Sequence, residues 1–182
     1  RRPRPAPGSG ARVELAAEYG ANLRDPRASG WARYGGTVGG FVDLTGTNRV
    51  LSLSATALFA DPLGQGEIPF TELVQLGGTN PMGGFYQGRL TGRSAAVVAL
   101  EYRYPIWAFL DASAQLAIGN VFDVHLAGLT PENQRLSFAF GLRSAGERDH
   151  SFNILFGGGT ETFGQGGHIS ELRFLIGATQ GF

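Results

Sequence analysis

Residues 68–103 read IPFTELVQLGGTNPMGGFYQGRLTGRSAAVVALEYR, and this stretch decides how the chain is interpreted. Its first half is irregular and rich in glycine. It ends in a run in which residue character alternates with a period of two. Such alternation is typical of a β-strand whose two faces meet different surroundings. The stretch therefore predicts a long loop over residues 61–93, followed by a strand.

The same alternation recurs along most of the chain and predicts about eight strands. The connections between them are long and short in turn. The long ones are 21–30, 61–93, 120–133 and about 163–168, and the short ones centre on 45–48, 105–108 and 145–150. An even strand number with alternating loop lengths is typical of bacterial outer-membrane barrels. The expected fold is thus all-β: an antiparallel transmembrane β-barrel over residues 11–182 with one long extracellular loop.

The two faces of the predicted strands differ in composition. One carries large apolar side chains, such as Phe138, Phe140, Phe152 and Phe174; the other carries Gly, Ala, Ser and Thr with scattered Arg and Glu. A soluble sandwich or lipocalin-like barrel would bury the apolar face. Its exterior would usually be dense in Lys and Glu, whereas this chain has no Lys. We therefore expect the apolar face to meet lipid.

Aromatic residues gather at both ends of the predicted strands, as expected for girdles at the two lipid interfaces. The set at the short-turn rim is Tyr102, Tyr104, Trp107, Phe109 and Phe182, and the set at the long-loop rim is Tyr19, Trp31, Tyr34 and Phe59.

Composition excludes several other classes of protein. The 29 glycines argue against a helical fold, and the absence of Cys excludes disulfides and thiolate metal sites. The 15 basic residues balance 15 acidic ones, so there is no electrostatic case for nucleic-acid binding. The three His residues lack metal-ligand spacing, and we expect neither a metal nor a cofactor.

Residues 1–10 have the composition of a linker or tail. They would either tether a periplasmic or upstream domain or be a disordered stub. The chain does not start with Met, so it is expected to be a processed mature protein or a piece of a longer one.

An eight-stranded barrel has an interior just wide enough for its own side chains. Inward-facing charged residues are predicted to fill it as a salt-bridge network, with the long loop lying on top. The network comprises Glu101, Arg103, Asp111, Arg135, Arg143, Glu171 and Arg173. Alternatively, the chain is half of a larger barrel, or two copies close one barrel as a homodimer.

Several motifs resemble the C-terminal barrel region of the BamA/TamA-type outer-membrane assembly superfamily, also called the bacterial surface antigen family. The matching residues are Pro69 and Phe70, Gly77 and Gly78, Glu101-Tyr102-Arg103, and Gly119 with Val121-Phe122-Asp123. The terminal Phe182, together with Phe174, resembles a C-terminal outer-membrane assembly signal. The resemblance covers about residues 49–182 and implies a bacterial outer-membrane protein in contact with outer-membrane lipid.

The loop tetrad of that superfamily, hydrophobic-Arg-Gly-aromatic, reads Met82-Gly83-Gly84-Phe85 here. Gly83 stands where the family has Arg, and Ala117 stands where the family has the strand Asp thought to pair with it. A lone buried Arg would be costly, so losing both is physically coherent. The departure predicts that the contact locking the loop inside the barrel is absent.

The resemblance implies a reduced insertase-like barrel, a scaffold or an anchor, and not an enzyme. The alternative is an outer-leaflet lipid-modifying enzyme, because His168 and Ser170 are two residues apart as in lipid-A deacylases. A catalytic triad also needs a carboxylate that orients the His. Glu171 is expected to point to the opposite face.

Overall fold

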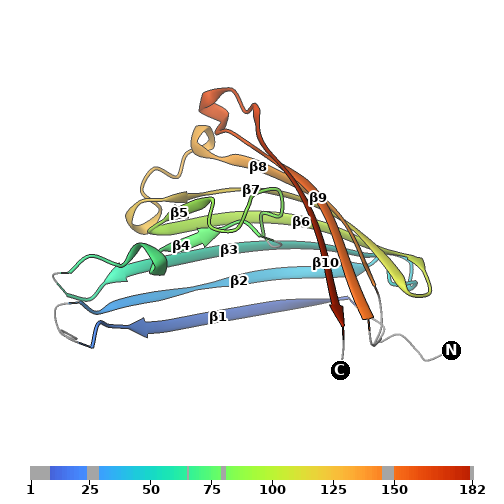
Figure 1. The fold of residues 1–182 in the computed structure, drawn as a ribbon, viewed down its shortest axis with the longest axis horizontal. Helices are drawn as coiled ribbons and strands as arrows, with labels where there is room; N and C mark the ends of the chain where they lie inside the picture. The colour runs from blue at the N-terminus through green and yellow to red at the C-terminus, as the bar shows by residue number, and fades with distance from the viewer. Residues whose placement is uncertain (1–8, 24–28, 65, 79–80, 145–149, 181–182) are drawn as a thin grey trace.

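The computed structural model describes residues 9–23, 29–64, 66–78, 81–144 and 150–180, without the side chains of 150, 151 and 178–180. Eight strands form one antiparallel sheet in the order β1-β2-β3-β6-β7-β8-β9-β10. Their bounds are Gly10–Gly20 (β1), Trp31–Asp43 (β2), Val50–Pro62 (β3), Ser94–Trp107 (β6), Leu110–Phe122 (β7), Arg135–Ser144 (β8), His150–Thr160 (β9) and Ile169–Gln180 (β10). Figure 1 shows a strongly curved sheet with the long connections at one end and the short turns at the other. The all-β antiparallel prediction is confirmed.

The predicted alternation of side chains agrees with the strand pairing, because residues of like character lie opposite each other on neighbouring strands. On the apolar face Leu53 lies opposite Leu100, and on the other face Thr37 lies opposite Thr56, with their hydroxyl oxygens 2.9 Å apart. The β2–β3 turn is closed by Asp43, whose carboxylate accepts the backbone N–H groups of Thr45 and Asn48 at 3.3 and 3.2 Å. Such local carboxylate bonds favour a turn over continued strand.

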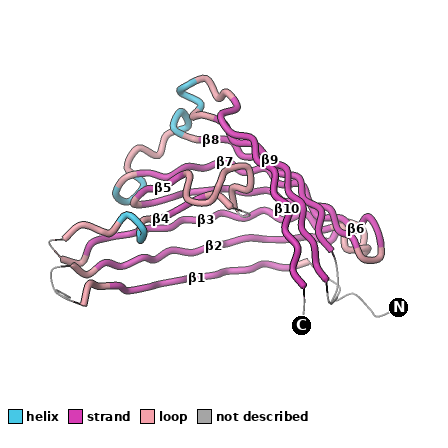
Figure 2. Tube along the Cα trace, viewed as in Figure 1, coloured by secondary structure: helices cyan, strands magenta, loops and turns pink. Residues whose placement is uncertain are grey.

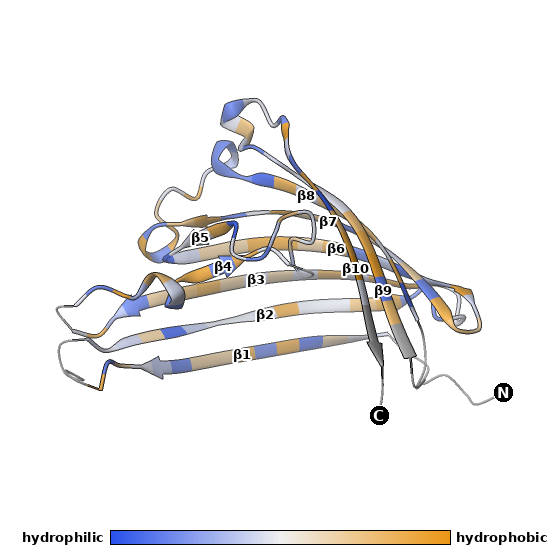
Figure 3. Ribbon diagram, in the orientation of Figure 1, coloured by the Kyte–Doolittle hydropathy of each residue, from blue (hydrophilic) through white to orange (hydrophobic). Residues whose placement is uncertain are grey.

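The two faces of the sheet are exposed to very different degrees. Phe140 and Phe174 on the apolar face are 57% and 62% exposed, whereas Arg173 on the opposite face is 7% exposed. Figure 3 shows the resulting bands of apolar and polar residues along the strands. An apolar face left open by the fold itself requires an apolar environment or a partner.

The sheet is not closed within the part of the chain that the structure describes. β1 and β10 are the terminal strands of the sheet order, and each pairs with one neighbour. An open edge presents unpaired backbone N–H and C=O groups. Closure into a barrel therefore stays a prediction, as do the half-barrel and homodimer alternatives.

The connections differ from the expectation in detail. β6 continues through Trp107, so the tight turn lies later than the predicted 105–108. The long loop contains a 3-10 turn, η1 (Phe70–Glu72), and a two-stranded hairpin of β4 (Val74–Leu76) and β5 (Leu90–Gly92). The other 3-10 turns are η2 (Val124–Leu126), η3 (Pro131–Asn133) and η4 (Phe163–Gln165), shown in cyan in Figure 2. The described part of the chain holds no helix long and apolar enough to cross a membrane.

Candidate functional site

The β4–β5 hairpin presents a loop tip, whose described residues 77–78 and 81–88 fold back on one another. The N–H of Gly78 donates to the carbonyl of Phe85 at 2.9 Å, and that of Phe85 donates to Met82 at 3.1 Å. Gly77 has a φ of +108°, and a Cβ there would lie 2.2 Å from the carbonyl oxygen of Tyr86. Only glycine fits such a backbone approach. The glycines of the tip thus have a structural role as well as conformational freedom.

The tip lies against the inner face of the sheet, and the expectation that the loop sits on top was wrong. Met82 and Phe85 are 0% and 1% exposed. They belong to one apolar cluster with the hairpin and with small side chains of the wall. The buried members of this cluster are Ala60, Val74, Leu76, Met82, Phe85, Leu90, Ala95, Val97, Ala99 and Ala117. Alanines on the inner wall leave the room that Met82 and Phe85 occupy.

Two wall side chains accept hydrogen bonds from the backbone of the tip. Gly83 N–H donates to Gln115 Oε1 of β7 at 3.0 Å, and Gly84 N–H donates to Ser137 Oγ of β8 at 2.9 Å. A Cβ on Gly84 would lie 2.0 Å from the carbonyl oxygen of Gly158 in β9. Gly83 and Gly84 therefore satisfy their buried amides through the wall, and Gly84 allows the backbones to approach closely.

Glycines of β9 form the seat for the tip. A Cβ on Gly159 would lie 2.4 Å from the Phe85 ring, and one on Gly157 would lie 3.0 Å from the Cα of Gly84. Sequence reasoning misses this packing role of Gly157–Gly159. The only sequence signal was a glycine run inside an otherwise regular strand, which can mark a close backbone approach.

Arg173 of β10 holds the tip from the wall. Its Nη1 donates to the carbonyl oxygens of Gly78, Gly83 and Phe85, the last two at 3.2 Å. Its guanidinium lies 5.6 Å from the centroid of the Tyr86 ring, a cation–π contact. The buried cation is thus solvated by peptide carbonyls and an aromatic face. The prediction that the loop is unlocked was wrong, since a guanidinium reaches the tip from the wall instead of from Gly83.

Glu171, on the same face of β10, also contacts the loop. Its Oε2 accepts the N–H of Tyr86 at 3.4 Å, and its Oε1 lies 3.4 Å from Nε of Arg89. Glu171 therefore points to the inner face, as expected from the alternation. Glu171 therefore helps to hold the loop on the inner face, and it does not lie on the outer face where a site at His168 and Ser170 was expected.

The other predicted lumen residues are distributed along the sheet. Glu101 and Arg103 pair with each other at 3.1 Å, and Arg135 pairs with Glu161 at 2.9 Å near the loop end. Asp111 also makes an interaction, and Arg143 is exposed. The seven residues proposed as one network are thus divided, with Glu171 and Arg173 engaged by the loop.

The structure offers little geometric support for a catalytic site at His168 and Ser170. The hydroxyl of Ser170 donates to the carbonyl of Gly159 at 3.4 Å, and the register of β10 shifts between Ile169 and Glu171. His168 precedes β10, and this irregularity interrupts the regular alternation of side chains at Ser170. Among the described residues, no group of three or more His, Asp and Glu could hold a metal ion.

Phe174 lies on the exposed apolar face of β10, whereas Phe182 falls outside the residues that the structure describes. Their role as a C-terminal assembly signal stays a prediction.

The fold and the contacts of the loop define a class of protein. It is an antiparallel β-sheet with an apolar outer face and with a glycine-rich loop fixed to its inner face. A family model described as the Omp85 superfamily domain matches residues 4–125, more than half of the chain, and the chain belongs to the Omp85 superfamily. Members of this superfamily are bacterial outer-membrane proteins, and membership relates the chain to outer-membrane assembly and translocation factors. No curated protein matches the chain.

Proposed function

We propose that the chain forms the wall of an outer-membrane β-barrel that acts as a reduced, insertase-like module for other outer-membrane proteins. Membership of the Omp85 superfamily supports the location and the kind of activity. The exposed apolar face of the sheet supports contact with lipid. The hydrogen bonds between the loop tip and the wall support an inner face of fixed shape.

The observation that carries the proposal is the asymmetry of the sheet. Arg173, Ser137 and Gln115 fix the loop tip to β7, β8 and β10. At the opposite side of the sheet β1 ends the strand order, and residues 10–19 are exposed. β1 and β10 are both terminal strands of the sheet order, and β1, the one that the loop tip does not brace, can template a further strand through main-chain hydrogen bonds. In lipid such an edge must find a partner, because unpaired backbone groups there are costly.

Reconstitution tests the proposal directly. The chain is folded into liposomes, an unfolded client barrel is added, and the rate of client insertion is followed by protease protection. We expect faster insertion than into empty liposomes, and a smaller acceleration for Arg173→Gln, which loosens the loop. Equal rates with and without the chain would reject the insertase role and leave a scaffold or anchor, for example of a domain preceding residues 1–10.

The lipid-modifying alternative predicts a different readout. Replacing His168 or Ser170 with Ala would change the acylation of lipid A in cells that carry the chain. Unchanged lipid A would reject the enzyme.

A further inference from the structure

The fixed loop adds a layer of backbone to the inner face of the sheet. Its tip contacts Ser137 of β8, Gly159 of β9 and Arg173 of β10, and the apolar cluster beneath the hairpin extends over β3, β6 and β7. A barrel of eight strands has an interior only just wide enough for its own side chains. Such a barrel has no room for the loop, so the eight strands of one copy do not close around it.

The inner face of β1 carries charged side chains. Arg12 and Glu14 form an ion pair, and their side chains are 71% and 54% exposed. Glu18 pairs with Arg33 of β2 at 2.7 Å. Charged side chains on an inner face suit a water-filled interior, which barrels of about 16–18 strands have. The wall therefore fits a barrel that is wider than its own strands can form.

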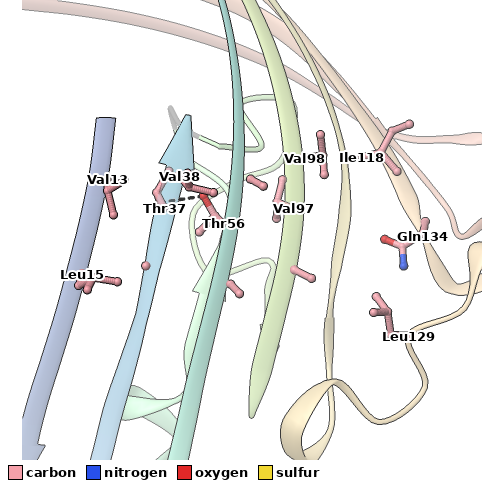
Figure 4. A pocket seen from close by; sticks show the side chains of 14 residues that line it. Val13, Leu15, Thr37, Val38, Thr56, Val97, Val98, Ile118, Leu129 and Gln134 are labelled. Atoms are coloured by element: carbon pink, nitrogen blue, oxygen red, sulfur yellow. Dashed lines mark hydrogen bonds between the residues drawn. The ribbon is translucent and has the colours of Figure 1, made fainter. Parts of the chain in front are cut away.

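The apolar face of the sheet extends as far as the edge at β1. One row of outward-facing residues in register crosses β1, β2, β3 and β6: Leu15, Gly36, Ala57 and Ala96. They line an apolar groove of about 780 Å³, and Figure 4 shows Val13 and Leu15 of β1 at one side of it. The opposite edge, β10, is also apolar outside, at Phe174 and Ile176. In lipid both edges need a strand partner, because unpaired backbone groups there are costly.

The two edges are complementary to each other. β1 (Gly10–Gly20) runs from the short-turn end to the long-loop end, and β10 (Ile169–Gln180) runs in the opposite direction. They are of nearly equal length, with 11 and 12 residues. A second copy in the same membrane orientation would thus bring its β10 antiparallel to β1. Val13 and Leu15 would then share the outer face with Phe174 and Ile176.

We propose that two copies of the chain close one barrel, in which β1 of each copy pairs with β10 of the other. Two eight-stranded sheets make sixteen strands, a size that leaves room inside for the loops. The two seams are identical and are related by a two-fold axis along the barrel. The inference rests on the lipid-facing orientation of the apolar face but not on insertase activity. A client strand would compete with the second copy for β1.

Crosslinking between the two edges tests the seam. The chain has no Cys, so Leu15→Cys and Phe174→Cys can be placed on separate chains that carry different tags. Both positions lie near the middle of an edge strand and on the outer face. The chains are folded together into vesicles and treated with a short bismaleimide. We expect a covalent dimer that carries both tags, with positions 15 and 174 linked in its peptides. A single chain with both substitutions should also give covalent dimers.

Two controls frame the result. Val13→Cys combined with Val38→Cys joins register partners of β1 and β2, and it should give internally linked monomers. Leu116→Cys lies on the outer face of β7, away from both edges, and its dimer yield with Leu15→Cys measures chance encounters. We expect the edge pair to exceed that yield at least several-fold.

A link between positions 15 and 174 within one chain would overturn the proposal, because it would show that eight strands close alone. A yield for the edge pair no higher than that of Leu116→Cys would overturn it as well, since the edges would then not meet in a second copy. Client insertion is measured on the same vesicles. A chain that inserts clients without edge crosslinks would reject the dimer alone, and a crosslinked dimer that inserts none would reject the insertase role alone.

Discussion

Arg173 has three acceptors on the loop tip and no carboxylate among them. A buried guanidinium bound to neutral carbonyls has its hydrogen-bond donors satisfied only while those carbonyls stay in place. The loop and the side chain therefore depend on each other. Release of the tip would leave both the cation and several peptide groups without partners.

We predict that Arg173→Gln loosens the loop, because a glutamine amide cannot supply the same charged hydrogen bonds. The loss should be on the order of 2–4 kcal/mol of docking free energy. Met82, the sole methionine and fully buried, reports the change. Its oxidation by hydrogen peroxide, followed by mass spectrometry, should speed up roughly tenfold or more.

Arg135→Gln is the control for this measurement. Arg135 is also a largely buried arginine of the inner face, but it contacts Glu161 and the carbonyl of Thr160 instead of the tip. Met82 oxidation should stay close to the wild-type rate. Equal rates for Arg173→Gln and the wild type would show that Arg173 does not hold the tip.

A second prediction concerns Gly84. Gly84→Ala would place its Cβ 2.0 Å from a backbone oxygen of β9, so the tip must move away from the wall. We expect a destabilisation of about 1–3 kcal/mol and faster Met82 oxidation. Gly40→Ala, whose nearest contact would be an ordinary 3.7 Å, serves as the control. A Gly84→Ala protein with the stability of Gly40→Ala would contradict the close approach.

For single residues, the sequence predicts the face of the sheet to which a side chain points, but not the groups that this side chain contacts. The alternation along β10 indicates correctly that Glu171 and Arg173 face inward. It cannot show that Arg173 meets the carbonyls of Gly78 and Gly83, because these lie about ninety residues away in the chain. Position 83 is Gly where the superfamily has Arg. This difference does not reveal that Arg173, in a strand of the wall, supplies a guanidinium to the loop instead.

Individual strands are the part of the fold that could be predicted best. Their signal is local: along most of β2 and β3 large apolar side chains recur at every second residue, because each strand has two different surroundings. The three-residue strands β4 and β5 were not predicted. They are too short for a periodic signal, and the hairpin is stabilised by packing on the inner wall.

The lipid-facing assignment makes a prediction for β8. Phe140→Arg places a charge in the middle of the exposed apolar face and should destabilise the folded chain in a bilayer by roughly 2–4 kcal/mol. Phe140→Leu, which keeps the site apolar, should cost much less. Reversible urea unfolding from vesicles measures both. A similar stability for the two variants would argue against lipid contact at this position.

The whole molecule is an open wall whose two edge strands, β1 and β10, each have one partner in the sheet. Sequence periodicity is the same for a strand in a closed barrel, a half-barrel or a dimer, so closure could not be predicted from it. The inward position of the loop was also missed. A lumen filled by side chains could be predicted only by assuming that the barrel closes. The structure instead packs Met82 and Phe85 of the loop against the inner face.

The orientation of the two faces underlies every proposal made here, and site-directed spin labelling measures it most directly. The chain has no Cys, so each introduced cysteine is the single thiol. Labels at Val38 and Leu53 should be more accessible to oxygen, which partitions into lipid. Labels at the adjacent Thr37 and Ser52 should be more accessible to a water-soluble nickel chelate. If labels at Thr37 and Ser52 were instead the more accessible to oxygen, and labels at Val38 and Leu53 the more accessible to the chelate, the apolar face would point away from the membrane. That result would contradict the proposals.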